Sequence, residues 1–207
     1  MNKFYKLLFL IPIIIVGCKN TDINNKKFSQ VIDNFDMNIY SIKGEKILSI
    51  KSPSSRYENS SNIINLDETT INLFKNNQTE YIINSNKSKL SDNKVLELNG
   101  NVIVKNTAQD ADNLYANNFT WDIRNTKYLL LGDVEFENNN IYLSSNKAIL
   151  NKANNVIEFF NPVKYKIKDS NNEGGYEINS ENAFYNIKTN SVSFTSKEDK
   201  VRSKIYF

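Results

Sequence analysis

A short sequence phrase recurs five times in this chain and constrains its fold more than any other feature. In each copy a small residue is followed three positions later by a small or apolar residue, and two positions after that by a large apolar one. The copies are SPSSRY at Ser52, SNKSKL at Ser85, ANNFTW at Ala116, SNKAIL at Ser145 and SENAFY at Ser180, at intervals of 33, 31, 29 and 35 residues. Such self-similarity indicates one supersecondary unit that is used several times.

The segments between these copies have the pattern of β-strands. Short runs of alternating apolar and polar residues are separated by clusters of Asn, Asp, Lys and Ser, and almost none of the sequence has a helical period. Asn and Asp tolerate left-handed turn conformations, so their clusters can form hairpin turns in a chain with only six glycines. The sequence therefore predicts an all-β protein.

A second phrase follows three of the copies, as VLELNGNVIV, YLLLGDVEFE and VIEFFNPVKYKI. Each contains a Gly, or Asn161-Pro162, between two pairs of apolar residues. Alternate residues of a strand project to one side, so each set of four is predicted to share a face. The twelve residues predicted to line this face are Leu96, Leu98, Val102, Val104, Tyr128, Leu130, Val134, Phe136, Ile157, Phe159, Val163 and Tyr165.

The two phrases together predict strands that bend in the middle. A glycine within a strand usually marks a bulge, a bend or a close backbone approach. In SNKAIL, Leu143 and Ser145 have one parity while Ala148 and Leu150 have the other, so a bulge is needed to turn all four inward. We therefore expect a flattened, V-shaped β-jelly roll built from repeats of about 30 residues, with open edges near 37–50 and 192–207.

Composition excludes most catalytic chemistry. The chain has no histidine and one cysteine, so it cannot build a typical zinc cluster, a Cys/His nucleophile or a disulfide. The acidic residues Glu97 and Glu158 occupy matching outward positions, which favours solvated strand residues over a glycosidase pair. We predict a protein that is not an enzyme and that has no cofactor and no metal site.

The first residues indicate export and a lipid anchor. Lys3 and Lys6 precede an apolar run from Leu7 to Val16, about half the ~20 residues that a membrane-spanning helix needs. The run ends in Ile-Val-Gly-Cys18, which resembles a bacterial lipobox. We predict a signal peptide over 1–17, a lipidated Cys18, a polar tether to residue 34 and a β-domain over 35–207; an uncleaved anchor is the alternative. Without Lys3 and Lys6 the formal charge falls from +3 to +1, which gives no basis for nucleic-acid binding.

The repeated motifs resemble the LptC family and its OstA-like relatives, periplasmic β-jelly-roll proteins of lipopolysaccharide transport. The likeness extends from about Asp36 to about Arg202 and is carried by Ser145/Ala148/Leu150 and Ala116/Trp121, with Gly100-Asn101-Val102 and Gly132-Asp133-Val134. The resemblance implies an open-edged trough that accepts lipopolysaccharide from an inner-membrane ABC transporter. It also implies transfer to another jelly-roll protein through edge-strand pairing.

The anchor departs from that family, whose members usually begin with a transmembrane helix. With Cys18 as the anchor, we expect the protein on the periplasmic face of a membrane, the inner one in this interpretation, with an apolar lining left free for acyl chains. Two alternatives remain open at this point. One is a parallel β-solenoid that binds or cleaves polysaccharide, and the other is a lipoprotein scaffold that uses its edges only for protein contacts.

Overall fold

The computed structural model consists of one antiparallel β-sheet. It describes residues 29–92, 94–107, 112–125, 127–138, 141–168, 175–197 and 201–206. Within them lie twelve strands: β1 (Ser29–Tyr40), β2 (Lys46–Glu58), β3 (Ile63–Lys75), β4 (Gln78–Ser91), β5 (Val95–Asn106), β6 (Asn113–Asp122), β7 (Lys127–Asn138), β8 (Ile141–Asn151), β9 (Val156–Lys168), β10 (Gly175–Asn186), β11 (Ser191–Thr195) and β12 (Arg202–Tyr206). The prediction of an all-β protein is confirmed.

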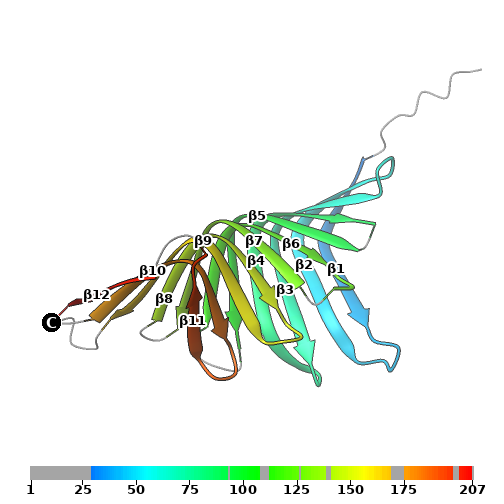
Figure 1. Ribbon diagram of the computed structural model, residues 1–207. Coiled ribbons are helices and arrows are strands. Elements are labelled where there is room, and N and C mark those ends of the chain that lie inside the picture. The colour runs from blue at the N-terminus through cyan, green and yellow to red at the C-terminus, as the bar shows by residue number, and fades with distance from the viewer. Residues whose placement is uncertain are drawn as a thin grey trace, which may run out of the picture.

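The strands follow one another in space as they do in the sequence. From β1 to β11 each strand pairs with its chain neighbour, and Figure 1 shows them side by side in this order. β12 also pairs with β10, against 175–179, whereas β11 pairs with 182–186. β11 and β12 together thus cover the length of β10 as a single interrupted strand would.

The strands from β4 to β10 each pass through a bend near the middle. The pairing register shifts at this level in six successive strand pairs, from β4/β5 to β9/β10. The bend divides the sheet into two layers. Layer A contains the N-terminal halves of β1, β3, β5, β7 and β9, the C-terminal halves of β2, β4, β6, β8 and β10, and β11. Layer B contains the other halves and β12. The bend predicted from the parity of Ser145 and Ala148 is confirmed, since both side chains are buried.

Left-handed backbone conformations accompany the bend in β5 and β7. The φ angles are +76° at Gly100 and +75° at Gly132, and the residues after them, Asn101 and Asp133, are also positive at +48° and +46°. A Cβ atom on Gly132 would lie 3.2 Å from the side chain of Asn117 in the preceding strand, β6. Glycine is therefore required at this level both for its conformation and for a close approach.

Serine hydroxyl groups satisfy backbone carbonyls on the even-numbered side of the bend. The Oγ atom donates to the carbonyl oxygen two residues later in four of the five repeat copies, at 2.6 Å for Ser52, 3.3 Å for Ser85, 2.9 Å for Ser145 and 2.9 Å for Ser180. A carbonyl displaced from the strand ladder by a bulge needs another donor when it is buried. The fifth copy has Ala116 and lacks a hydroxyl group.

The edges lie partly where the sequence placed them. β11 and β12 are the outermost strands at the C-terminal end, as predicted. At the N-terminal end the edge strand is β1, which begins at Ser29, inside the segment interpreted as a tether, and Lys46–Ile50 belongs to the second strand. The reason is that residues 29–33 pair through their backbone with β2 while their side chains stay largely exposed, so their composition reads as a linker.

Candidate functional site: the space between the two layers

All twelve residues predicted to line the apolar face are buried, and none is more than 4% exposed. Six of them lie in layer A and six in layer B, on the surfaces that the layers turn toward each other. Those in layer A are Leu96, Leu98, Tyr128, Leu130, Ile157 and Phe159; those in layer B are Val102, Val104, Val134, Phe136, Val163 and Tyr165. Because each strand bends between its two apolar pairs, one strand supplies both walls of the interior.

Aromatic side chains join the layers in the C-terminal half of the sheet. The ring of Phe136 in layer B lies 4.5 Å from that of Tyr185 and 6.2 Å from that of Phe159, both in layer A. Tyr165 in layer B meets Phe194 of β11 edge-on at 5.2 Å. Such pairs contribute about 0.5–1.5 kcal/mol beyond the area they bury. The interior is therefore packed here, which corrects the expectation of a lining left free.

A small cavity remains between the layers near the middle of the sheet. It measures about 20 Å³ and is lined by Tyr81, Val104, Asn106, Asp112, Leu114 and Phe136 from the layer B side and Leu150, Ile157 and Ile187 from the layer A side. A volume of this size holds about one water molecule. An acyl chain can enter only if the two layers separate or if side chains move.

Polar groups connect the layers along the rim, where the turns of layer A face those of layer B. The Nζ atom of Lys152, in the β8–β9 turn, lies 2.7 Å from Oε2 of Glu80 in β4 and 5.6 Å from the centre of the Tyr81 ring. Burial raises the pKa of Tyr81 to about 12, with a further contribution from Glu80. These residues are more than 70 positions apart in the sequence, and no motif signalled their contact.

A second rim contact is buried. Asn138 of layer B donates from Nδ2 to the hydroxyl of Tyr185 in layer A at 3.0 Å, and also to Asp112. The Tyr185 hydroxyl donates to Oδ1 of Asn190 at 2.9 Å. Burial raises the pKa of Asp112 above its ordinary value, against the smaller opposing effect of its hydrogen bonds with Asn138 and Asn106.

The contacts between layers are staggered along the sheet. Phe136 in the layer B half of β7 touches the layer A halves of β9 and β10. Glu80 in the layer B half of β4 touches the β8–β9 turn of layer A. Each strand of layer A therefore lies over a strand of layer B that comes two to four strands earlier in the chain. The last part of layer B is consequently uncovered, and its inward-facing Tyr176 and Ile205 are 36% and 64% exposed. Apolar inner surface is thus accessible at the C-terminal end.

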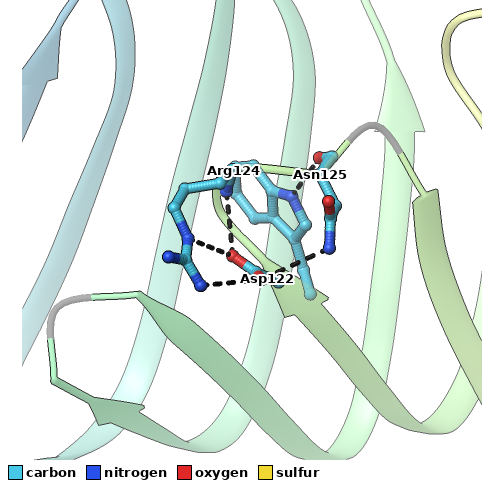
Figure 2. Close-up of polar contacts among 4 residues, drawn as sticks. Asp122, Arg124 and Asn125 are labelled. Carbon is cyan, nitrogen blue, oxygen red and sulfur yellow. Dashed lines mark hydrogen bonds and ion pairs between the residues drawn. The ribbon is translucent and has the colours of Figure 1, made fainter.

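Trp121 is a packing residue at the tip of layer A. Its indole is 3% exposed, its ring centre lies 5.1 Å from that of Tyr128, and its Nε1 donates to the carbonyl oxygen of Asn125 at 3.0 Å. Figure 2 shows that the carboxylate of Asp122 accepts hydrogen bonds from the side chains of Arg124 and Asn125 in the same turn. Hydrogen bonds from Arg124 hold the pKa of Asp122 below its ordinary range. This turn fixes the indole over the interior.

Neither a metal site nor a membrane-spanning helix is found in the described part of the chain. No group of three or more His, Cys, Asp or Glu side chains there is arranged to hold a metal ion. The described residues also contain no helix long and apolar enough to cross a membrane.

Two further residues were singled out in the sequence. Glu97 faces Lys89 on the outer surface, with 3.8 Å between Oε2 and Nζ. Cys18 lies outside the described residues.

An open antiparallel sheet, bent along its middle and apolar on its inner surfaces, defines an open-edged β-jelly-roll protein. The family described as lipopolysaccharide-assembly, LptC-related, matches residues 15–129, more than half of the chain. The chain belongs to the LptC family, and the resemblance to this family is confirmed over the matched residues, which end before Gly132 and the copy at Ser145. The family places it in lipopolysaccharide transport in the periplasm and not among enzymes.

Solved structures of other proteins are similar to this chain. No curated protein matches the sequence. The crystal structure of LptH from Pseudomonas aeruginosa, described as the LptA homologous periplasmic component of the conserved lipopolysaccharide transport device, is similar with a TM-score of 0.48 and 12% sequence identity. The match covers 61% of this chain and 94% of that chain.

Proposed function

We propose that this protein is a membrane-tethered component of the lipopolysaccharide export bridge. It accepts the acyl chains of lipopolysaccharide from an inner-membrane ABC transporter complex into the space between its layers, and passes them to the next jelly-roll protein. The observation that carries the proposal is that the twelve buried apolar residues are divided between two facing layers, which are continuous through the bend and meet elsewhere through side-chain contacts.

The energy of binding comes from the lipid. Removing an acyl chain of ten methylenes from water gains roughly 8 kcal/mol at 0.8 kcal/mol per methylene. When the layers separate around an acyl chain, the inner side chains exchange contacts with each other for contacts with the lipid. The free-energy cost of separating the layers is therefore lower when an acyl chain fills the gap than when water does. Sugars and phosphates would remain in solvent at the rim.

Directional movement requires an external source of energy. None of the six glycines forms the phosphate-binding loop GxxxxGK[ST]. A partner that hydrolyses a nucleotide, such as an ABC transporter, is the natural source. The protein then supplies a path along which the lipid slides between apolar surfaces.

A lipid on Cys18 would hold the domain close to the membrane. Cys18 precedes Ser29, the first residue of β1, by eleven positions, and an extended segment of that length reaches about 40 Å. Diacyl anchoring is stable because two chains act together. Mass spectrometry of the mature N-terminus tests the modification, and an intact leader or an unmodified Cys18 would contradict it.

The sheet edges are suited to joining other β-proteins. Among the described strands, β1 has one neighbour, and β11 and β12 pair only with β10, so each exposes a row of backbone groups. Addition of a partner strand would extend the sheet and also cover the apolar surface at Tyr176 and Ile205. Continuous inner surfaces would then lead from one protein to the next.

Photo-crosslinking tests lipid entry directly. Phe159 points inward and is fully buried, whereas the adjacent Phe160 faces outward beside Lys147, with 5.1 Å between Nζ and the ring centre. Benzoylphenylalanine at position 159 is expected to give lipopolysaccharide adducts in the presence of the transporter, and at position 160 it is not. Positions Leu98 and Leu130 serve as further inward probes. Folded proteins without adducts at any inward position would refute lipid conduction.

The two alternatives fare differently. A parallel β-solenoid is inconsistent with the fold, because every strand pair among the described residues is antiparallel. A scaffold that binds only proteins is the outcome in which partners are crosslinked at the edges while the inward positions yield no lipid.

A further inference from the structure

The mouth of the jelly roll is the opening between the two layers at the rim, opposite the bend. Three residues bridge this mouth, and we name them the rim latch: Glu80, Tyr81 and Lys152. Lys152 belongs to the tip of layer A, while Glu80 and Tyr81 begin β4 in layer B. Besides the ion pair and the ring contact described above, Lys75 places its Nζ 3.4 Å from Oε1 of Glu80. The Lys152 and Glu80 side chains are 30% and 19% exposed, so water only partly screens their attraction.

The rim latch lies directly over the interior. Tyr81 takes part in the contact with Lys152 and also lines the cavity of about 20 Å³, opposite Leu150 and Ile157 of layer A. Burial raises the pKa of Tyr128 in layer A, and the nearby Tyr81 and Glu80 of layer B raise it further, which indicates that the layers approach closely at this point. Separating Lys152 from Glu80 would open the cavity toward solvent.

The contacts that close the mouth differ in whether a lipid can replace them. Apolar contacts between the layers can be exchanged for contacts with an acyl chain at little cost. The ion pair and the ring contact have no counterpart in an acyl chain. A ligand shifts a conformational equilibrium only through its different affinity for the two states. The polar contacts therefore favour the closed state in a way that the lipid does not offset.

We propose that the rim latch holds the two layers closed at the middle of the jelly roll, and that its release admits an acyl chain to the cavity beneath it. This inference rests on the proposed function, because it names the gate of the same lipid site. The buried hydrogen bond from Asn138 to Tyr185 joins the layers at a second point of the rim.

The distance across the mouth can be measured with spin labels on two turns. Asn77 in the β3–β4 turn and Asn154 in the β8–β9 turn are exposed, one on each side of the mouth. Cysteines there can be labelled in the full-length protein in lipid nanodiscs, since the thioether of a lipidated Cys18 does not react with thiol reagents. The protein without added cysteines serves as the labelling blank.

Lys152→Met removes the charge and keeps most of the apolar stem. We expect it to raise the population of longer distances at least twofold in the absence of lipopolysaccharide. It should also raise the rate of lipid adduct formation from benzoylphenylalanine at position 159 at least threefold. Lys188→Met is the matched control, because Lys188 is exposed in the neighbouring turn of the same layer and has no described partner across the mouth. It should leave both readouts unchanged.

Salt and a charge reversal complete the test. High salt should lengthen the distances in the native protein and have little further effect on Lys152→Met. The charge reversal Glu80→Lys with Lys152→Glu is made together with Lys75→Gln, because Lys75 lies beside Glu80 and would repel a second cation there. This triple variant should restore the short distances, and it remains informative if Lys152→Met does not fold. Native distances in Lys152→Met, or long distances in the triple variant, would overturn the rim latch. The distances are measured without lipopolysaccharide, so failure of the native protein to take up purified lipopolysaccharide would count against the proposed function alone.

Discussion

At the scale of single residues, the repeated serines owe their position to a hydrogen bond. Ser145 donates to the carbonyl oxygen of Lys147, and the same bond recurs two residues beyond Ser52, Ser85 and Ser180. Only small side chains fit where the layers converge, and among them serine can also pair a displaced carbonyl. The repeat therefore records a local requirement of the bend. Ala116 meets the size requirement without the hydrogen bond.

The buried carboxyl group of Asp112 makes stability depend on pH. Burial raises its folded-state pKa above 3.8, so as the pH rises through the window just above that value the unfolded chain ionises while the folded protein still holds the proton. Stability is lost across this window. Asp112→Asn keeps an acceptor for Asn138 and removes the titration, so the variant should gain stability relative to the native protein between about pH 3 and pH 7. Urea unfolding across this range measures the difference, and a constant difference would contradict the assignment.

At the scale of the strand, a left-handed pair of residues turns a long strand from one layer into the other. β5 uses Gly100-Asn101 and β7 uses Gly132-Asp133, with positive φ at all four residues. β4, β6 and β8 instead carry two successive exposed residues, such as Asn146 and Lys147, between buried Ser145 and Ala148. The two solutions are complementary, because the glycine approaches the asparagine of the neighbouring strand.

Gly132→Ala should be more destabilising than Gly44→Ala. Both glycines have positive φ, +75° and +81°, which costs an alanine about 1–2 kcal/mol. A Cβ atom on Gly132 would also meet Asn117 at 3.2 Å, whereas nothing lies within 4 Å of one on Gly44. The effect of the added methyl group on the unfolded chain is similar in both. Chemical unfolding should show an additional loss of about 1 kcal/mol at position 132, and equal losses would argue against a tight bend.

At the scale of the whole molecule, the stagger of the layers makes the N-terminal and C-terminal ends of the sheet differ in how much of the inner surface is covered. The C-terminal end exposes inward-facing Tyr176 and Ile205 of layer B, where no described strand of layer A covers them. A neighbouring sheet that joined this edge could supply the missing cover. The fold therefore has a direction, which suits a component of a chain of similar proteins.

Ile205→Pro tests that junction. Proline removes a backbone N–H from β12 and cannot support strand addition, so binding of the next jelly-roll protein should weaken about tenfold or more. The domain itself should stay folded, because β12 is a short peripheral strand. Ile205→Ser is the matched variant, since it keeps the N–H and removes the apolar side chain. Unchanged binding by the proline variant would refute edge pairing, and equal losses in both would assign the effect to the apolar surface.

The sequence predicted the parts of the structure that depend on neighbours along the chain. The alternation around Gly100 and Gly132 fixed which side chains turn inward, because strand geometry sets side-chain direction with a period of two. The change of parity between Ser145 and Ala148 located the bulge. The start of β1 at Ser29 was missed, since an edge strand with exposed side chains has no apolar pattern to mark it.

What only the tertiary structure decided is how the two layers meet. The contacts of Phe136 with Tyr185 and of Lys152 with Glu80 join residues about 50 and 70 positions apart, and they depend on the twist that accumulates from strand to strand. The alternation of apolar and polar residues along a strand predicts that a side chain points inward. It does not predict which residues that side chain will contact. The amino-acid sequence thus determined a bent, two-layered sheet with an apolar interior, whereas the packing of that interior and its polar closure at the rim follow from the geometry of the whole sheet.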